Sequence, residues 1–273
     1  MDADPRPHSI LTGLYIRNLA ANLIGNLIIA LLNIFTPLDF LKDWMGFLAG
    51  GGWALVPLFI FTAAAIVTIL QFYIQRPIAR YLALRMRAEK AHGALELQAR
   101  QRLLNLPILL GLTNLAVWLS LNIIVTPVMF VILDMALSSF LYNFFRVLMI
   151  GIMASFISFF LIDDFVREKL IPLIGPAGRL SAIPGTVRIS ILRRIRVLFG
   201  VGTNAPMILL WATIAFAVWE LDETLVNTAQ FSRSILTFSG LVFIVFIIMS
   251  LSLNILVLKS ILRPINDMIG VVC

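Results

Sequence analysis

The chain has 273 residues, of which 60% are hydrophobic and 13% are charged, and its mean hydropathy is +1.00. A soluble domain of this size could not bury so much apolar surface, so the composition excludes an ordinary globular domain. The formal net charge is +7, but the basic residues lie beside apolar segments, where attraction to anionic lipids explains them, and we expect the lipid bilayer rather than a nucleic acid as partner.

Six apolar segments are long enough to cross a bilayer as helices, since a hydrocarbon core about 30 Å thick needs roughly 20 apolar residues. They comprise residues 18–38, 46–75, 103–133, 137–162, 197–219 and 234–258, and only the fourth contains a charged residue, Arg146. The sequence therefore predicts an all-α membrane protein that forms a bundle of six transmembrane helices.

Segments rich in Lys and Arg precede, separate and follow pairs of these spans. Eighteen of the 21 basic residues lie in residues 1–17, 76–102, 163–200 and 259–273. Because basic segments are retained in the cytoplasm, we expect a cytoplasmic arm at 1–17, a cytoplasmic basic helix at 76–102 and a cytoplasmic amphipathic connector at 163–200. The C-terminal segment, 259–273, is then cytoplasmic as well, so both termini lie on the same side.

The spans form three hairpins, residues 18–75, 103–162 and 201–258, that share two landmarks. In each hairpin the first span carries an asparagine near its cytoplasmic end, and a proline follows the second span. We therefore expect an internal repeat of about 90 residues, with three antiparallel hairpins packed around a common axis and the asparagines facing the interior at equivalent depths. The landmarks are Asn26, Asn114 and Asn204, spaced by 88 and 90 residues, and Pro77, Pro172 and Pro264, spaced by 95 and 92 residues.

Residues with catalytic or metal-binding chemistry are scarce in the predicted spans. His8 and His92 both fall in cytoplasmic segments, so the spans offer no imidazole ligand. Asp163 and Asp164 fall at a cytoplasmic helix end, where we expect them to be solvated, and Arg146 is expected near the outer interface, snorkelling or paired with the nearby Asp134. We expect no catalytic, cofactor-binding or metal site in this chain.

The sixth span continues without a predicted loop into residues 259–273. The stretch from Leu258 through Arg263 and Pro264 resembles the start of the first helix of a HAMP signalling domain, where a proline follows the last membrane helix and apolar positions recur at heptad spacing. The resemblance implies that Leu258, Arg263 and Pro264 belong to a signal-transmitting exit helix and that the working unit is a homodimer. It also implies a downstream HAMP and effector domain, so we expect that the sequence is truncated or that this partner domain has been omitted.

Three further segments resemble bacterial class III adenylyl or guanylyl cyclases that have six spans, a HAMP domain and a C-terminal catalytic domain. These segments are residues 99–107 (ARQRLLNLP), 178–181 (GRLS) and 185–190 (GTVRIS). The resemblance implies a membrane anchor and sensor in the bacterial inner membrane, with cyclic nucleotide synthesis confined to the missing domain. Because the predicted outer loops are short, we expect any stimulus to be apolar or lipid-like.

Two other functions remain open. HAMP domains also serve histidine kinases, phosphatases and chemoreceptors, so the effector could belong to one of those classes. A six-span transporter is the other alternative, and Pro37, Asp39 and Lys42 match the Pro-x-acidic-x-x-basic signature of mitochondrial carriers at the end of the first span. The other hairpins lack this signature, and it lies on the side opposite the basic segments, which disfavours a carrier.

Overall fold

The computed structural model describes residues 7–35, 49, 53, 55–87, 93–132, 134, 137–174, 183, 185–187, 190–223 and 228–272. All secondary structure in this described part is helical. Six of its helical stretches are long and apolar enough to cross a membrane. The described part of the chain is therefore all-helical, and its six long apolar helices are those of a multi-pass membrane protein.

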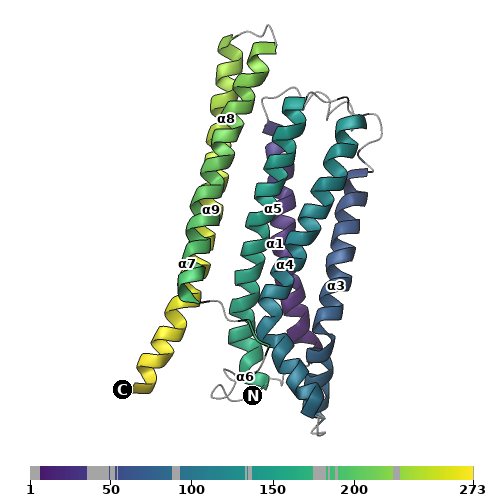
Figure 1. The fold of residues 1–273 in the computed structure, drawn as a ribbon, viewed down its shortest axis with the longest axis vertical. Coiled ribbons are helices and arrows are strands. Elements are labelled where there is room, and N and C mark those ends of the chain that lie inside the picture. The colour runs from purple at the N-terminus through teal and green to yellow at the C-terminus, as the bar shows by residue number, and fades with distance from the viewer. Residues whose placement is uncertain are drawn as a thin grey trace.

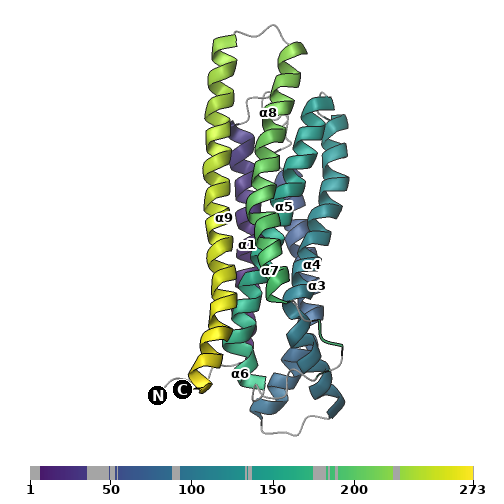
Figure 2. The same ribbon diagram turned by 60° about the vertical axis from the view of Figure 1, so that its left-hand side comes forward.

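The long helices lie side by side along the length of the molecule (Figures 1 and 2). In chain order they are α1 (Pro7–Phe35), α3 (Leu55–Met86), α4 (Gly93–Ile132), α5 (Leu137–Phe165), α8 (Ala205–Glu223) and α9 (Thr228–Val272), and the short helices are α6 (Ile171–Ile174) and α7 (Ile191–Phe199). The start of α1 and the end of α9 lie at the same end of the bundle (Figure 1).

Several helices continue through prolines. Pro77 lies inside α3, and α4 contains both Pro107 and Pro127. Two other prolines follow short π-helical segments: Val166–Leu170 joins α5 to α6 just before Pro172, and Gly200–Asn204 joins α7 to α8 just before Pro206. Proline lacks the N–H donor and its ring crowds the carbonyl four residues earlier, so a wider turn immediately before it lets the helix continue.

Helix α5 is the central element of the bundle and contacts α1, α4, α8 and α9. In the apolar window of the fourth span 61% of the residues are buried, against 11% in the second span and 28% in the sixth. These three spans would be equivalent if three like hairpins surrounded a common axis. The unequal burial shows that the hairpins do not occupy equivalent environments.

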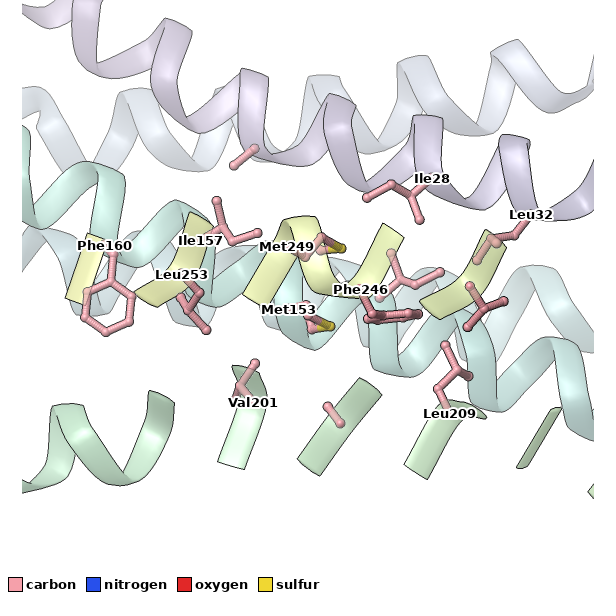
Figure 3. Close-up of a cluster of buried hydrophobic side chains, with 14 of the residues drawn as sticks. Ile28, Leu32, Met153, Ile157, Phe160, Val201, Leu209, Phe246, Met249 and Leu253 are labelled. Atoms are coloured by element: carbon pink, nitrogen blue, oxygen red, sulfur yellow. The ribbon is translucent and has the colours of Figure 1, made fainter. Parts of the chain in front are cut away.

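Two clusters of buried apolar side chains hold the helices together. The larger cluster joins α1, α5, α8 and α9, and Figure 3 shows Phe246, Met249 and Leu253 of α9 close to Met153 and Ile157 of α5. The smaller cluster packs the end of α3 and the first half of α4 against the end of α5 and α6. Other large apolar side chains cover the outside of the helices and suit contact with lipid; Phe61, Phe72, Val131, Trp211 and Leu236 are 72–77% exposed.

One of the segments expected to be cytoplasmic is organised differently from the prediction. Residues 76–102 do not form one helix, because α3 continues to Met86 and α4 begins at Gly93. Both spans thus extend as helices beyond their apolar parts, which long basic side chains permit because they can reach the headgroup region. In the connector, α7 begins after Ser190, whose hydroxyl accepts a hydrogen bond from the Arg193 N–H, and continues through the π-helical segment into α8.

Candidate functional site

Four polar side chains from four different helices meet inside the bundle. They are Asn18 of α1, Gln71 of α3, Asn114 of α4 and Ser158 of α5, and none is more than 1% exposed. We call this set the polar network. Burying a polar group within the membrane costs free energy unless the group forms a hydrogen bond. The four helices therefore pack in the arrangement that brings these side chains together.

Asn18 is the centre of the polar network. Its Nδ2 donates to Gln71 Oε1 at 2.7 Å, and its Oδ1 accepts from Asn114 Nδ2 and from the Ser158 hydroxyl, each at 2.6 Å. Asn114 Nδ2 also donates to Ser158 Oγ at 2.8 Å. Two buried atoms of the network, Gln71 Nε2 and Asn114 Oδ1, have no hydrogen-bond partner within the described residues. The network therefore retains an amide NH2 group and an amide oxygen that could bond to a further polar group.

A second layer of polar contacts lies along α1 beside the network. Asn22 Nδ2 donates to the Asn18 carbonyl at 2.9 Å, and Asn22 Oδ1 accepts from Trp118 Nε1 of α4 at 2.9 Å. The indole fits because two glycines face it: a Cβ placed on Gly151 would lie 2.9 Å from Trp118 Cβ, and one on Gly25 would lie 3.1 Å from Trp118 Cζ2. Small residues thus let α1, α4 and α5 approach closely around a large aromatic side chain.

Arg146 is wholly buried in α5, with an exposure of 0%. Its guanidinium carbon lies 5.2 Å from the centroid of the Tyr142 ring, and its Nη2 donates to Asn143 Oδ1 at 2.8 Å. The Tyr142 hydroxyl is 3.2 Å from the Thr213 hydroxyl of α8. The expectation that Arg146 snorkels is wrong, because its side chain is enclosed by the bundle, where the Tyr142 ring and the Asn143 amide stabilise the cation.

The predicted asparagines occupy three different environments. Asn114 is part of the polar network, whereas Asn26 is half-buried and donates to the Asn22 carbonyl of its own helix at 3.0 Å. Asn204 lies in the π-helical segment before α8 and is exposed. The expectation of equivalent interior positions therefore fails for Asn204, because the wider turn before Pro206 alters which residues face inward.

The residues of the predicted exit helix all fall within α9, which runs unbroken from Thr228 to Val272. Leu258 is 52% exposed. The side chains of Arg263 and Pro264 lie outside the described part of the structure. The backbone of α9 is thus a single helix through the sixth span and beyond it.

Two of the segments that resemble cyclase sequences contact each other. Asn105, in residues 99–107, donates from Nδ2 to the Gly185 carbonyl at 3.0 Å and accepts at Oδ1 from the Val187 N–H at 2.8 Å. Gly185 has a φ of +76°, a conformation that favours glycine. One side chain of α4 therefore fixes the segment that precedes α7.

Sequence reasoning missed Asn18 and Gln71 as members of one site. The four-residue spacing of Asn18, Asn22 and Asn26 could have indicated a polar site, since it places all three asparagines on one face of a helix. No cluster of three or more His, Cys, Asp or Glu side chains in the described residues is arranged to hold a metal ion. The expectation that Asp163 is solvated is wrong, because its side chain is buried and pairs with Arg167 of the next turn at 3.1 Å.

Comparisons with protein-family models, with curated proteins and with solved structures find no match for this chain. A function for this chain is therefore inferred from the packing of its helices and from its sequence patterns. Helix α9 continues to Val272, past the end of its candidate span at Leu256.

Proposed function

We propose that this chain is the membrane anchor and sensor of a bacterial adenylyl or guanylyl cyclase, in which α9 transmits the signal to a HAMP domain and a catalytic domain. The observation that carries the proposal is the unbroken helix α9, which has 45 residues. At about 1.5 Å per residue it is about 68 Å long, more than twice the thickness of a hydrocarbon core. It continues past the end of the sixth span at Leu256 to Val272.

The packing supports movement of α8 and α9 relative to the other helices. Hydrogen bonds of the polar network connect α1, α3, α4 and α5 directly. In contrast, α8 and α9 adjoin α5 through apolar side chains that include Met153 and Met249, with the Tyr142 and Thr213 hydroxyls adding a polar contact to α8. Apolar contacts between helices are weakly favoured in lipid, and methionine adapts readily to a new packing arrangement.

We infer that a stimulus acts by changing this packing. An apolar or lipid-like ligand that binds two arrangements of α8 and α9 unequally would shift their populations. The ligand would reach the interface from within the bilayer. The chain itself would have no enzymatic activity and no cofactor, and it would work as a homodimer in the inner membrane with both termini in the cytoplasm.

The proposal includes an internal repeat of three antiparallel hairpins, α1 with α3, α4 with α5, and α8 with α9. Its support is that the helix continues past the proline that follows each second span: through Pro77 to Met86, through Pro172 to Ile174 and through Pro264 to Val272. In this arrangement the hairpin of α4 and α5 lies at the centre of the bundle and the other two hairpins lie at its sides. The different positions account for the unequal burial of the spans.

The contact between residues 99–107 and 185–190 also supports the resemblance to cyclases. Two segments identified independently in the sequence are joined by both polar atoms of the Asn105 amide. A shared structural role would explain why both segments resemble the same family.

A six-span transporter is the second candidate, and the polar network is the observation that favours it. Intramembrane polar groups often mark a substrate pathway. The network and the buried Arg146 are both compatible with a small polar substrate. A HAMP-linked kinase, phosphatase or chemoreceptor would instead preserve the sensor role and change only the effector.

The experiment compares membranes that contain the product of the complete reading frame with membranes that contain residues 1–273 alone. We expect cyclic AMP or cyclic GMP to form from ATP or GTP only with the complete product. Absence of both cyclic nucleotides from folded material in the membrane would refute the cyclase assignment. Uptake of a hydrophilic solute into liposomes by residues 1–273 would favour the transporter.

A further inference from the structure

A small pocket lined by three arginines lies between α3 and α4. Arg76 and Arg80 come from α3 and Arg102 comes from α4, with Tyr73 and Gln98 also in the lining. The pocket has a volume of about 220 Å³. The lining residues follow helical spacing on both helices, so each helix turns one face toward the pocket.

The three arginines are not neutralised by carboxylates in the described part of the chain. The nearby Glu96 pairs with Arg100, which does not line the pocket. Arg76 and Arg80 are exposed, and Arg102 is half-buried. The pocket therefore concentrates positive charge and guanidinium donors, and guanidinium groups bind phosphate oxygens with two parallel hydrogen bonds.

The position of the pocket along the helices matches the depth of lipid headgroups. Arg76 is the first charged residue after the uncharged run 46–75, and Arg102 is the last before the uncharged run 103–133. The pocket thus lies where two apolar segments end. On α3, next to the pocket, Ile69, Phe72 and Tyr73 are 67%, 74% and 69% exposed and offer an apolar surface for an acyl chain.

The geometry points to a binding site for the phosphate of an anionic phospholipid headgroup, held by Arg76, Arg80 and Arg102 with the acyl chains along the exposed face of α3. The size of the pocket suits a headgroup better than a drug-sized molecule, for which pockets of about 300–1,000 Å³ are usual. Basic pockets between membrane helices are a known means of headgroup recognition. This site is independent of the effector that α9 serves.

The test measures lipid binding to purified residues 1–273 in nanodiscs of phosphatidylcholine. Phosphatidylglycerol is titrated in and bound lipid is counted by native mass spectrometry, with glycerol phosphate and inorganic phosphate as soluble competitors. Simultaneous Arg76→Gln, Arg80→Gln and Arg102→Gln should weaken phosphatidylglycerol binding by at least about tenfold. The matched control, Arg85→Gln, Arg193→Gln and Arg196→Gln, removes the same charge from exposed arginines outside the pocket and should weaken binding clearly less than the pocket variant does.

Three results would overturn the proposal. Equal loss in the two triple variants would show attraction to net charge alone, and equal binding by the pocket variant and the unaltered protein would place the lipid elsewhere. Displacement of the lipid by an equal concentration of inorganic phosphate would identify a soluble anion as the occupant. If the glutamine variant fails to fold, the three arginines are changed to lysine instead, which keeps the charge and should still weaken binding because lysine cannot form the paired hydrogen bonds.

Discussion

Asn18 of α1 and Asn114 of α4 are 96 residues apart in the sequence and are joined inside the bundle by a hydrogen bond of 2.6 Å from Asn114 Nδ2 to Asn18 Oδ1. Neither side chain has any exposed surface. Each amide also bonds to Ser158. The first two hairpins are thus connected through one polar centre.

Replacement of Asn18 by alanine should destabilise the bundle more than replacement of Asn26 by alanine. The first change leaves Gln71 Oε1 and Asn114 Nδ2 with one partner fewer, whereas Asn26 bonds only to a carbonyl of its own helix among the contacts described. We expect a loss of about 1–3 kcal/mol for Asn18→Ala, measured by unfolding in detergent. Equal losses for the two variants would show that the network does not specify the packing.

A methyl group at Gly151 should push Trp118 out of its place between α1 and α5. The added Cβ would lie 2.9 Å from Trp118 Cβ, whereas a Cβ at Gly240 of α9 meets no other atom within 4 Å. We expect Gly151→Ala to lower the free energy of unfolding by about 1–3 kcal/mol and Gly240→Ala to leave it unchanged or raise it. A stable Gly151→Ala protein would contradict the close packing at the indole.

The burial of Arg146 can be tested with a cysteine at the same position, after Cys273 is changed to serine. A hydrophilic thiol reagent should react with Arg233→Cys, whose arginine is exposed, and should not react with Arg146→Cys. Both variants remove one positive charge, so they differ in position alone. Rapid labelling at position 146 would restore the interpretation that this residue lies at the interface.

The contact between Asn105 and the segment before α7 can be tested by hydrogen exchange. The Val187 N–H donates to Asn105 Oδ1, so Asn105→Leu should remove its protection. Asn105→Asp keeps the acceptor and should preserve much of the protection, while it loses the donor to the Gly185 carbonyl. Unchanged exchange of Val187 in the leucine variant would show that the contact contributes nothing to the order of this segment.

The spans could be predicted from the sequence because each is a local property of one segment. A run of about 20 residues without charge specifies a membrane helix whatever surrounds it. The same reasoning predicted a helix that leaves the sixth span without a loop, and α9 is continuous from Thr228 to Val272.

The direction in which each polar side chain points could not be predicted, because it depends on which helices become neighbours. Asn204 belongs to the same sequence pattern as Asn114, yet it is exposed beside a wide helical turn. Arg146 was assigned to the interface because Tyr142 and Asn143, which precede it by four and three residues in the same helix, do not reveal that other helices enclose its side chain. The burial of Arg146 follows from packing around α5, and the exposure of Asn204 follows from the wider turn before Pro206.

The most direct test of signal transmission through α9 is to insert residues between Leu258 and Pro264 of the complete protein and to measure cyclic nucleotide formation. Two alanines rotate the downstream helix by about 200°, and seven return it to within about 20° of its original direction. A helix that transmits orientation should lose its normal output with two alanines and largely recover it with seven. Equal output from both insertions would show that α9 is only a tether and would contradict the proposed function.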